Sequence, residues 1–245
     1  MRTNRNAEEL LALQPNPLEP RAEEVERYIG ALQMLAESDP DLAGRQTWTQ
    51  IRLAGIRAGR RRDEAHDSLN RIFRLGTLPE SGLDGRFDGV AVTPTTFTAT
   101  DPVLRALSTL WMPWLGKRFD AETATGDNIM PPGARLPSKL LWPGYRFLIL
   151  GDGRYGAFRF RTYAGAGVVD ADRRVLKIDY GWDENPKFLI RDILDELVRV
   201  VPGVYLGKAL LRRDGPVNPS WRLVGYFALR PAAPDVSVGP SASRP

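Results

Sequence analysis

The spacing of apolar residues changes from a helical to a strand-like period along the chain, with the change near Gly82. Between residues 21 and 75, apolar side chains recur at intervals of three and four, which is the period of an amphipathic helix. A Ser-Asp-Pro triplet at 38–40 ends one such stretch, and Gly76 follows the last one. This part of the chain therefore predicts two or three helices.

Short segments after Gly82 alternate between apolar and polar residues and are rich in aromatic and β-branched residues. A Gly-Asp-Gly sequence at 151–153 predicts a hairpin turn between two of them. The predicted strands are residues 87–93, 146–151, 155–165, 174–180, 205–212 and 221–230. Antiparallel strands joined by short turns indicate a closed or nearly closed β-barrel, because closure removes edge strands.

One segment among these strands has a helical pattern. Asn185 followed by Pro186 is typical of a helix N-terminus, and apolar residues then recur at helical spacing up to a Pro-Gly pair at 202–203. The pattern predicts a helix over 185–201, and a further short helix is predicted over 101–115. The expected fold class is mainly β with α (α+β): an antiparallel β-barrel preceded by two or three N-terminal helices, with one helix inserted between late strands.

Composition divides the chain into four parts. Residues 1–20 contain prolines spaced to prevent a helix, and residues 231–245 are rich in Pro, Ser, Gly and Ala. We expect both to be disordered tails, because neither has the apolar surface that a packed core needs. They enclose an N-terminal helical segment at 21–78 and a β-barrel domain at 79–230.

The residue counts narrow the possible chemistry. The chain has no cysteine, which excludes disulfides, thiolate metal ligands and cysteine nucleophiles. With 34 basic and 30 acidic residues, the net charge of +4 is weak evidence for an anionic partner. The N-terminus lacks the apolar stretch of a signal peptide, and no run of about 18 apolar residues exists. We therefore expect a cytoplasmic protein without a transmembrane segment, and no feature bears on its oligomeric state.

Two similar sequences, WLGKRF at 114–119 and YLGKALL at 205–211, contain the Gly-Lys pair of a phosphate-binding loop. Neither has the upstream glycine or the downstream Ser or Thr of a P-loop, and no dinucleotide-binding fingerprint is present. The sole histidine, His66, lies in a polar stretch and is predicted to be exposed on a helix. We therefore expect no cofactor and no metal.

The densest positive region is the arginine-rich run at 57–63. Acidic residues follow it immediately, and no aromatic residues are interleaved with it. A platform for single-stranded nucleic acid needs such aromatic residues. Nucleic-acid binding is therefore not expected, and a solvated helix face is the favoured interpretation.

Several motifs of the predicted barrel domain resemble a little-characterised group of bacterial proteins. They are GLDGRFDG (82–89), WLGKRFD (114–120), LKIDY (176–180), the segment 185–212 and WRLVGYFAL (221–229). The chain is also loosely similar to GXWXG-type domains of unknown function, although Phe87 stands where their tryptophan is expected. The resemblance covers residues 79–230 and implies a calycin-like barrel, similar in outline to lipocalins and fatty-acid carriers. It implies no established activity.

Aromatic and basic residues of the predicted barrel form the candidate site. A barrel of about eight strands is either filled by side chains or holds one small ligand. The candidate basic anchors are Lys117 and Lys208, and the candidate lining residues are Trp111, Trp114, Tyr205 and Tyr226. We expect the barrel to bind a small lipophilic, possibly anionic, ligand.

Two other functions fit the same residues. Asp179 or Tyr180 would act as acid or base in a cofactor-free isomerase, cyclase or lyase on the same barrel. Alternatively, the N-terminal helices would form a protein-interaction module supported by the barrel. A buried carboxylate at the mouth of a cavity favours the enzyme, and a large exposed apolar stripe on the helices favours the interaction module.

Overall fold

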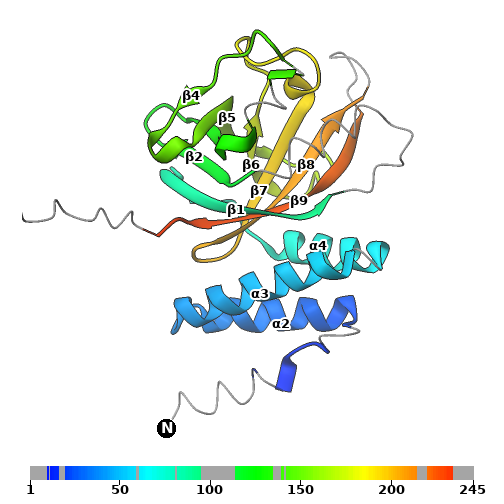
Figure 1. Ribbon diagram of the computed structural model, residues 1–245. Coiled ribbons are helices and arrows are strands. Elements are labelled where there is room, and N and C mark those ends of the chain that lie inside the picture. The colour runs from blue at the N-terminus through cyan, green and yellow to red at the C-terminus, as the bar shows by residue number, and fades with distance from the viewer. Residues whose placement is uncertain are drawn as a thin grey trace, which may run out of the picture.

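The computed structural model of the protein describes residues 10, 12–16, 20–58, 61–80, 82–94, 114–134, 139–140, 142–213 and 220–233. Three helices form a layer against one side of a β-barrel (Figure 1). They are α2 (Ala22–Leu35), α3 (Pro40–Ala58) and α4 (Arg62–Leu75). No helix in the described part of the chain has both the length and the apolar character needed to cross a membrane.

Nine strands of the described chain form one antiparallel sheet. They are β1 (Gly85–Pro94), β2 (Gly116–Asp120), β3 (Thr125–Met130), β4 (Leu148–Ile149), β5 (Tyr155–Ala166), β6 (Arg174–Asp179), β7 (Ile193–Val201), β8 (Val204–Arg212) and β9 (Trp221–Pro231). The sheet closes into a barrel because β1 pairs with β9 and β3 pairs with β5, and β4 adds only to β5. The predicted fold class, an antiparallel barrel preceded by helices, is confirmed.

The connections between strands divide between the two ends of the barrel. Turns at 121–124, 167–173 and 202–203 join β2 to β3, β5 to β6 and β7 to β8 at one end. The other four connections start and finish at the opposite end, because successive barrel strands are antiparallel. We call this opposite end, where β2 and β7 begin and β3 and β6 finish, the mouth.

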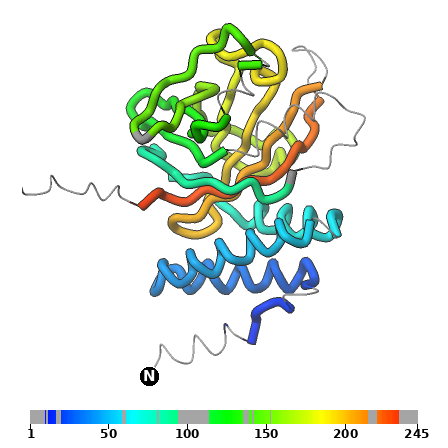
Figure 2. The backbone as a smooth tube through the Cα atoms, in the orientation of Figure 1, coloured from blue at the N-terminus to red at the C-terminus, as the bar shows by residue number. Residues whose placement is uncertain are grey.

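The barrel wall separates two hydrophobic cores. The interior core includes Phe87, Phe119, Phe160, Ile178, Leu197, Phe227 and Leu229. The second core lies between the outer wall and the helices and includes Val25, Ile29, Leu32, Leu69, Ile72, Phe73, Val198, Leu206 and Ala228. Figure 2 shows this helical layer, coloured blue to cyan, along the barrel. The apolar faces of the helices are therefore used in packing, and Met34 and Ile56 are the large apolar helix residues that are mostly exposed.

The helix predicted over 185–201 is wrong. Residues Ile193–Val201 form strand β7, preceded by the short 3₁₀ turn η3 (Ile190–Asp192). Every residue of β7 except Arg199 is buried, since one face looks into the barrel and the other lies under the helices. A strand buried on both faces loses its alternation, and periodicity alone does not distinguish it from a buried helix.

Several predictions fall on other parts of the chain. The helix predicted over 101–115 lies outside the described residues, except for Trp114 and Leu115 at its end. Most of the two predicted tails also lies outside the described residues. Strand β9 continues to Pro231, at the start of the C-terminal one.

Candidate functional site

Lys117 points into the barrel from the second residue of β2. Arg118 beside it faces outward and Phe119 inward, as the alternation of a strand requires. Gly116 precedes the lysine with a φ of 147°, and a β-carbon there would lie 2.0 Å from the carbonyl oxygen of Phe87. Only glycine tolerates this approach, so Gly116 allows β2 to begin close to the backbone of β1.

Four polar side chains converge inside the barrel near its mouth. We call Lys117, Asn128, Tyr180 and Asp195 the interior cluster. The Lys117 ammonium donates hydrogen bonds to Asn128 Oδ1 and Asp195 Oδ2, each at 2.9 Å, and to the Tyr180 hydroxyl. The Tyr180 hydroxyl donates to Asp195 Oδ2 at 3.0 Å. The four residues come from β2, from β3, from the end of β6 and from β7, so barrel closure is what brings them together.

The interior cluster is removed from water. Lys117 is 2% exposed and Asp195 is 3% exposed. Burial lowers the pKa of Lys117, and the neighbouring Asp195 charge opposes that change. Burial also raises the pKa of Tyr180 well above its ordinary value, and Asp195 adds to the rise. Tyr180 therefore keeps its proton at neutral pH and acts as a hydrogen-bond donor.

Aromatic rings enclose the ammonium. They belong to Trp114, Phe160, Tyr180 and Phe227, whose centroids lie 5.5, 5.2, 5.0 and 5.2 Å from Lys117 Nζ. Cation–π attraction at these distances offsets part of the cost of burying the charge. Trp114 also donates its indole N–H to Asn128 Oδ1 at 3.1 Å, which orients the amide.

Two glycines make room for these rings. A β-carbon at Gly126 would lie 2.5 Å from the Phe160 ring, and one at Gly207 would lie 2.2 Å from the Phe227 ring. Both distances are shorter than any side-chain contact allows. These rings, which need glycine beneath them, fill the interior on the side of the cluster away from the mouth. On the mouth side, Trp142, Leu189 and Ile190 are buried in the same core.

Three buried polar atoms near the mouth have no hydrogen-bond partner among the described residues. They are Asp195 Oδ1, the second carboxylate oxygen of the cluster, the indole nitrogen of Trp142, and Oδ1 of Asn185 on the connection from β6 to β7. Buried polar atoms in native proteins are almost always paired, so each exception needs an explanation. A bound molecule with matching hydrogen-bonding groups would supply one.

The backbone next to the cluster is strained. Phe158 has a φ of 53°, in a bulge where Asp127 of β3 faces two residues of β5. Its carbonyl accepts a hydrogen bond from Asn128 Nδ2 at 3.5 Å, and its N–H donates to the Tyr145 hydroxyl at 2.6 Å. Leu189, on the connection that leads into β7, has a φ of 74°. Non-glycine residues in this conformation concentrate at functional sites.

Lys208 and Tyr226 lie on the outer wall of the barrel, under α4, and are not part of the interior cluster. The Lys208 ammonium donates to Asn70 Oδ1 at 2.6 Å and to Asp170 Oδ2. Successive residues of a strand point to opposite sides of the wall. In the second Gly-Lys pair, Gly207 faces the interior, so Lys208 faces outward, whereas Lys117 of the first pair faces inward. The two candidate lysines are thus on opposite sides of the wall.

The remaining candidate lining residues are also dispersed. Trp114 joins the interior cluster, as described above. Tyr205 is half-buried on the inner face and packs edge-on against Phe87, with ring centroids 5.7 Å apart. Trp111 lies outside the described residues.

Of the two candidate acid–base residues, only Tyr180 belongs to the cluster. Asp179 points out of the barrel, where it accepts a hydrogen bond from the Gly181 N–H at 2.8 Å and pairs with Arg161 at 3.4 Å. Sequence reasoning missed Asn128 and Asp195. A charged residue within the apolar run of 193–201 was the available signal for Asp195, and the helical interpretation of that run concealed it.

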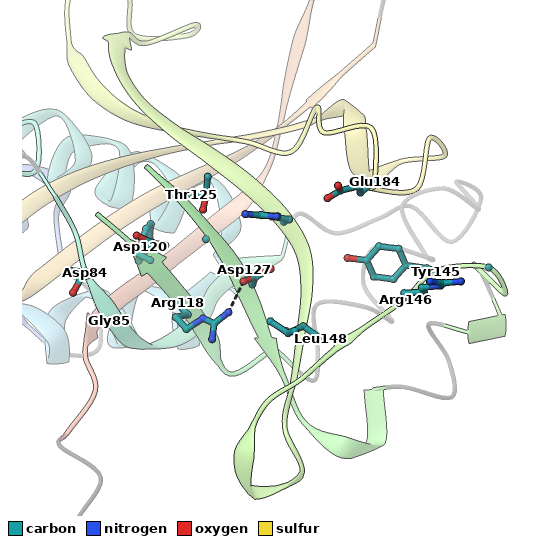
Figure 3. A pocket seen from close by; sticks show the side chains of 15 residues that line it. Asp84, Gly85, Arg118, Asp120, Thr125, Asp127, Tyr145, Arg146, Leu148 and Glu184 are labelled. Carbon is teal, nitrogen blue, oxygen red and sulfur yellow. Dashed lines mark hydrogen bonds and ion pairs between the residues drawn. The ribbon is translucent and has the colours of Figure 1, made fainter. Parts of the chain in front are cut away.

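A polar groove of about 890 Å³ lies on the outer face of β2, β3 and β5, opposite the cluster (Figure 3). Its lining includes Arg118, Asp127, Tyr145, Arg146, Leu148, Arg159 and Glu184. Arg118 and Asp127, opposite each other on the paired strands β2 and β3, form an ion pair at 2.9 Å on one wall of the groove. Within the described ranges, no group of three or more His, Asp or Glu side chains is placed to hold a metal ion.

Comparisons with known proteins identify no family. No protein-family model matches the sequence, and no curated protein matches it significantly. Among solved structures, the crystal structure of a protein from Thermomonospora curvata matches with a TM-score of 0.38 and 16% identity, over 74% of this chain and 99% of that one. A similarity at this level carries no argument about function, which therefore depends on the site itself.

Proposed function

We propose that the barrel binds a small lipophilic molecule at its mouth, with the polar end of that molecule hydrogen-bonded to the interior cluster. The observation that carries this proposal is Asp195 Oδ1, a buried carboxylate oxygen that has no donor among the described residues, in a cluster that is otherwise complete. An unpaired buried oxygen does not help an ion pair to stabilise the fold, whereas a binding site needs an unpaired group with which a ligand can form a hydrogen bond.

The hydrogen-bonding groups of the cluster that are still unpaired favour a ligand whose polar end is a hydrogen-bond donor. The three hydrogens of the Lys117 ammonium already have acceptors in Asn128, Tyr180 and Asp195. An anionic ligand would therefore have to displace Asp195 or lie beside its charge. A hydroxyl or N–H donor completes Asp195 Oδ1 without displacing anything. We infer a neutral ligand that carries such a donor on a lipophilic body, which refines the expectation of a possibly anionic one.

A matched pair of fluorescent probes tests this proposal. N-phenylnaphthylamine is neutral, lipophilic and has one N–H, and anilinonaphthalene sulfonate has the same rings with an added anion. We expect saturable binding of the neutral probe, at least about tenfold tighter than that of the sulfonate. Equal or reversed affinities would favour an anion site instead.

A double variant separates recognition from folding. Lys117→Met/Asp195→Leu removes both charges and keeps the volume apolar, a change that folded proteins often tolerate. It should remain folded and lose at least about tenfold in affinity for the neutral probe. Arg118→Met/Asp127→Leu makes the same replacement in a pair on the outer face of the neighbouring strands and should leave binding unchanged. Equal binding by both variants would refute the proposal.

The contacts of Tyr180 favour a second candidate function on the same site, proton transfer. Its hydroxyl touches both Lys117 and Asp195 and keeps its proton. In an isomerase-type reaction, Tyr180 would donate to a carbonyl oxygen while the Asp195 carboxylate removes a proton from the adjacent carbon through Oδ1. Solvent deuterium incorporation into a long-chain methyl ketone, lost in Tyr180→Phe, tests this. No incorporation above background would exclude it.

A further inference from the structure

A second pocket, open to solvent on one side, lies on the outer wall of the barrel, between α4 and strands β8 and β9. It has a volume of about 280 Å³. Its lining includes His66, Asn70, Lys208, Leu210, Leu223 and Tyr226. Lys208 and Lys117 face opposite sides of the wall, so this space, which we call the α4 pocket, is separate from the interior cluster.

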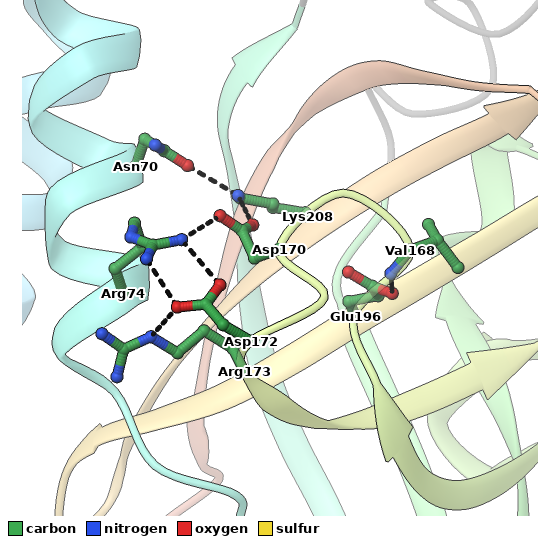
Figure 4. A network of polar contacts seen from close by, with 8 residues as sticks. All are labelled: Asn70, Arg74, Val168, Asp170, Asp172, Arg173, Glu196 and Lys208. Carbon is green, nitrogen blue, oxygen red and sulfur yellow. Dashed lines mark hydrogen bonds and ion pairs between the residues drawn. The ribbon is translucent and has the colours of Figure 1, made fainter.

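Three polar residues of the α4 pocket have nitrogen atoms whose hydrogen-bonding groups are not all paired. Lys208 is 2% exposed, and its ammonium donates to Asn70 and Asp170, leaving one hydrogen (Figure 4). The Asn70 side-chain nitrogen has no acceptor within the described chain. His66 Nε2 is buried and has no hydrogen-bond partner among the described residues.

The carboxylates around the α4 pocket are already paired. Asp170 binds Arg74 at 2.8 Å as well as Lys208, as Figure 4 shows. Asp67, at the rim, pairs with Arg71 at 3.2 Å. The two nearest carboxylates are therefore already in ion pairs, whereas Lys208 and Asn70 keep N–H groups without an acceptor among the described residues, which suits a ligand that brings acceptors.

The prediction that His66 is exposed is wrong, and its environment also suits an acceptor ligand. The ring is half-buried and packs edge-on against Tyr226, with centroids 5.7 Å apart. Burial lowers the pKa of His66, Arg62 lowers it further, and Asp63 opposes both. The imidazole is therefore neutral at neutral pH, and in the tautomer that carries the proton on Nε2 it adds a donor to Lys208 and Asn70.

We propose that the α4 pocket binds a small carboxylate with an apolar body. The carboxylate would accept hydrogen bonds from Lys208, Asn70 and His66. The apolar body would pack against Leu210, Leu223 and the Tyr226 ring. A pocket of this size and mixed lining fits one ring or a short branched chain.

The single histidine gives a direct test by NMR, because the chain has only one imidazole. Titration with benzoate should shift the His66 imidazole signals saturably and raise the pKa of His66, since a carboxylate favours the protonated ring. Benzyl alcohol, which has a similar shape and no charge, should do neither. Equal shifts with both compounds, or none with benzoate, would overturn the proposal.

Substitutions at the rim of the α4 pocket test whether benzoate binds there. Val169 lines the pocket and is 56% exposed, so Val169→Trp should fill the space without disturbing the fold. We expect it to weaken benzoate binding at least about tenfold by calorimetry, with Val169→Ala as the matched control near wild type. His66→Phe keeps the ring packing and should weaken binding by a smaller factor.

The interior double variant Lys117→Met/Asp195→Leu should leave benzoate binding intact. Benzoate binding by this variant therefore distinguishes a failure of the α4-pocket proposal from a failure of the proposed ligand binding inside the barrel. If Val169→Trp binds benzoate as wild type does, or if only the interior variant loses it, the α4 pocket is not the site.

Discussion

At the residue scale, the pair of Lys117 and Asp195 raises an energetic question, because burying two charges costs more than their attraction returns unless hydrogen bonds complete both groups. Lys117 is complete: its three hydrogens have acceptors, and four rings surround it. Asp195 is not, since its Oδ1 has no donor within the part of the chain that the structure describes. The pair is therefore explained better by binding than by stability.

This asymmetry predicts the outcome of a mutant cycle. Lys117→Met should lower the free energy of unfolding by about 3–5 kcal/mol, because it leaves the Asp195 charge buried and unpaired. Adding Asp195→Leu should recover most of that loss. Urea unfolding monitored by circular dichroism measures both. As a control, Arg118→Met breaks a partly exposed pair in the same strand and should cost at most about 1 kcal/mol. A double variant no more stable than Lys117→Met would contradict the argument.

The glycine of the second Gly-Lys pair predicts a packing effect. Gly207→Ala should destabilise the protein by about 1–3 kcal/mol, because the added methyl group meets the Phe227 ring. Gly30→Ala is the matched control: its β-carbon has nothing within 4 Å, and it lies inside α2. That change should stabilise the protein by up to about 1 kcal/mol. Thermal unfolding of the two variants in parallel checks the signs, and equal shifts would show that the Phe227 contact is unimportant.

At the element scale, whether a helix or strand could be predicted from the sequence depended on how many of its faces are buried. The helices were predictable because each has one apolar face, seen in Val25, Ile29 and Leu32 of α2. Strand β7 was not, because both of its faces are buried. Strand β3 was not predicted either, because its six residues include a glycine followed directly by two polar residues. The direction of Lys117 and Lys208 depends on strand parity, which pairing determines and sequence spacing does not.

The packing of α4 on the barrel predicts a dependence on pH. The pKa of His66 is lowered in the folded state, so the unfolded chain takes up the proton first. Stability is therefore unaffected above the ordinary histidine pKa of about 6.5 and decreases as pH falls through that value toward the folded-state pKa. His66→Phe should flatten this part of the profile. Urea midpoints at pH about 5 and about 7.5 measure it, and an unchanged slope in the variant would assign the dependence to other groups.

At the scale of the whole molecule, the barrel wall separates two environments, each with one buried lysine. Lys117 faces the interior core, and Lys208 faces the core shared with the helices. The barrel and its preceding helices followed from periodicity and turn residues. The interior cluster did not, because its four members come from separate strands and meet only when the barrel closes. Lys117, Trp114 and Tyr180 were identified from the sequence, and Asn128 and Asp195 needed the three-dimensional structure.

We propose above all that Asp195 Oδ1 receives its missing hydrogen bond from a ligand at the mouth of the barrel. A crystal structure of the protein with bound N-phenylnaphthylamine tests it most directly. We expect the rings of the probe at the mouth and its N–H within about 3 Å of Asp195 Oδ1. A probe bound only outside the barrel, for example in the groove of Figure 3, with Asp195 Oδ1 still unpartnered, would contradict it.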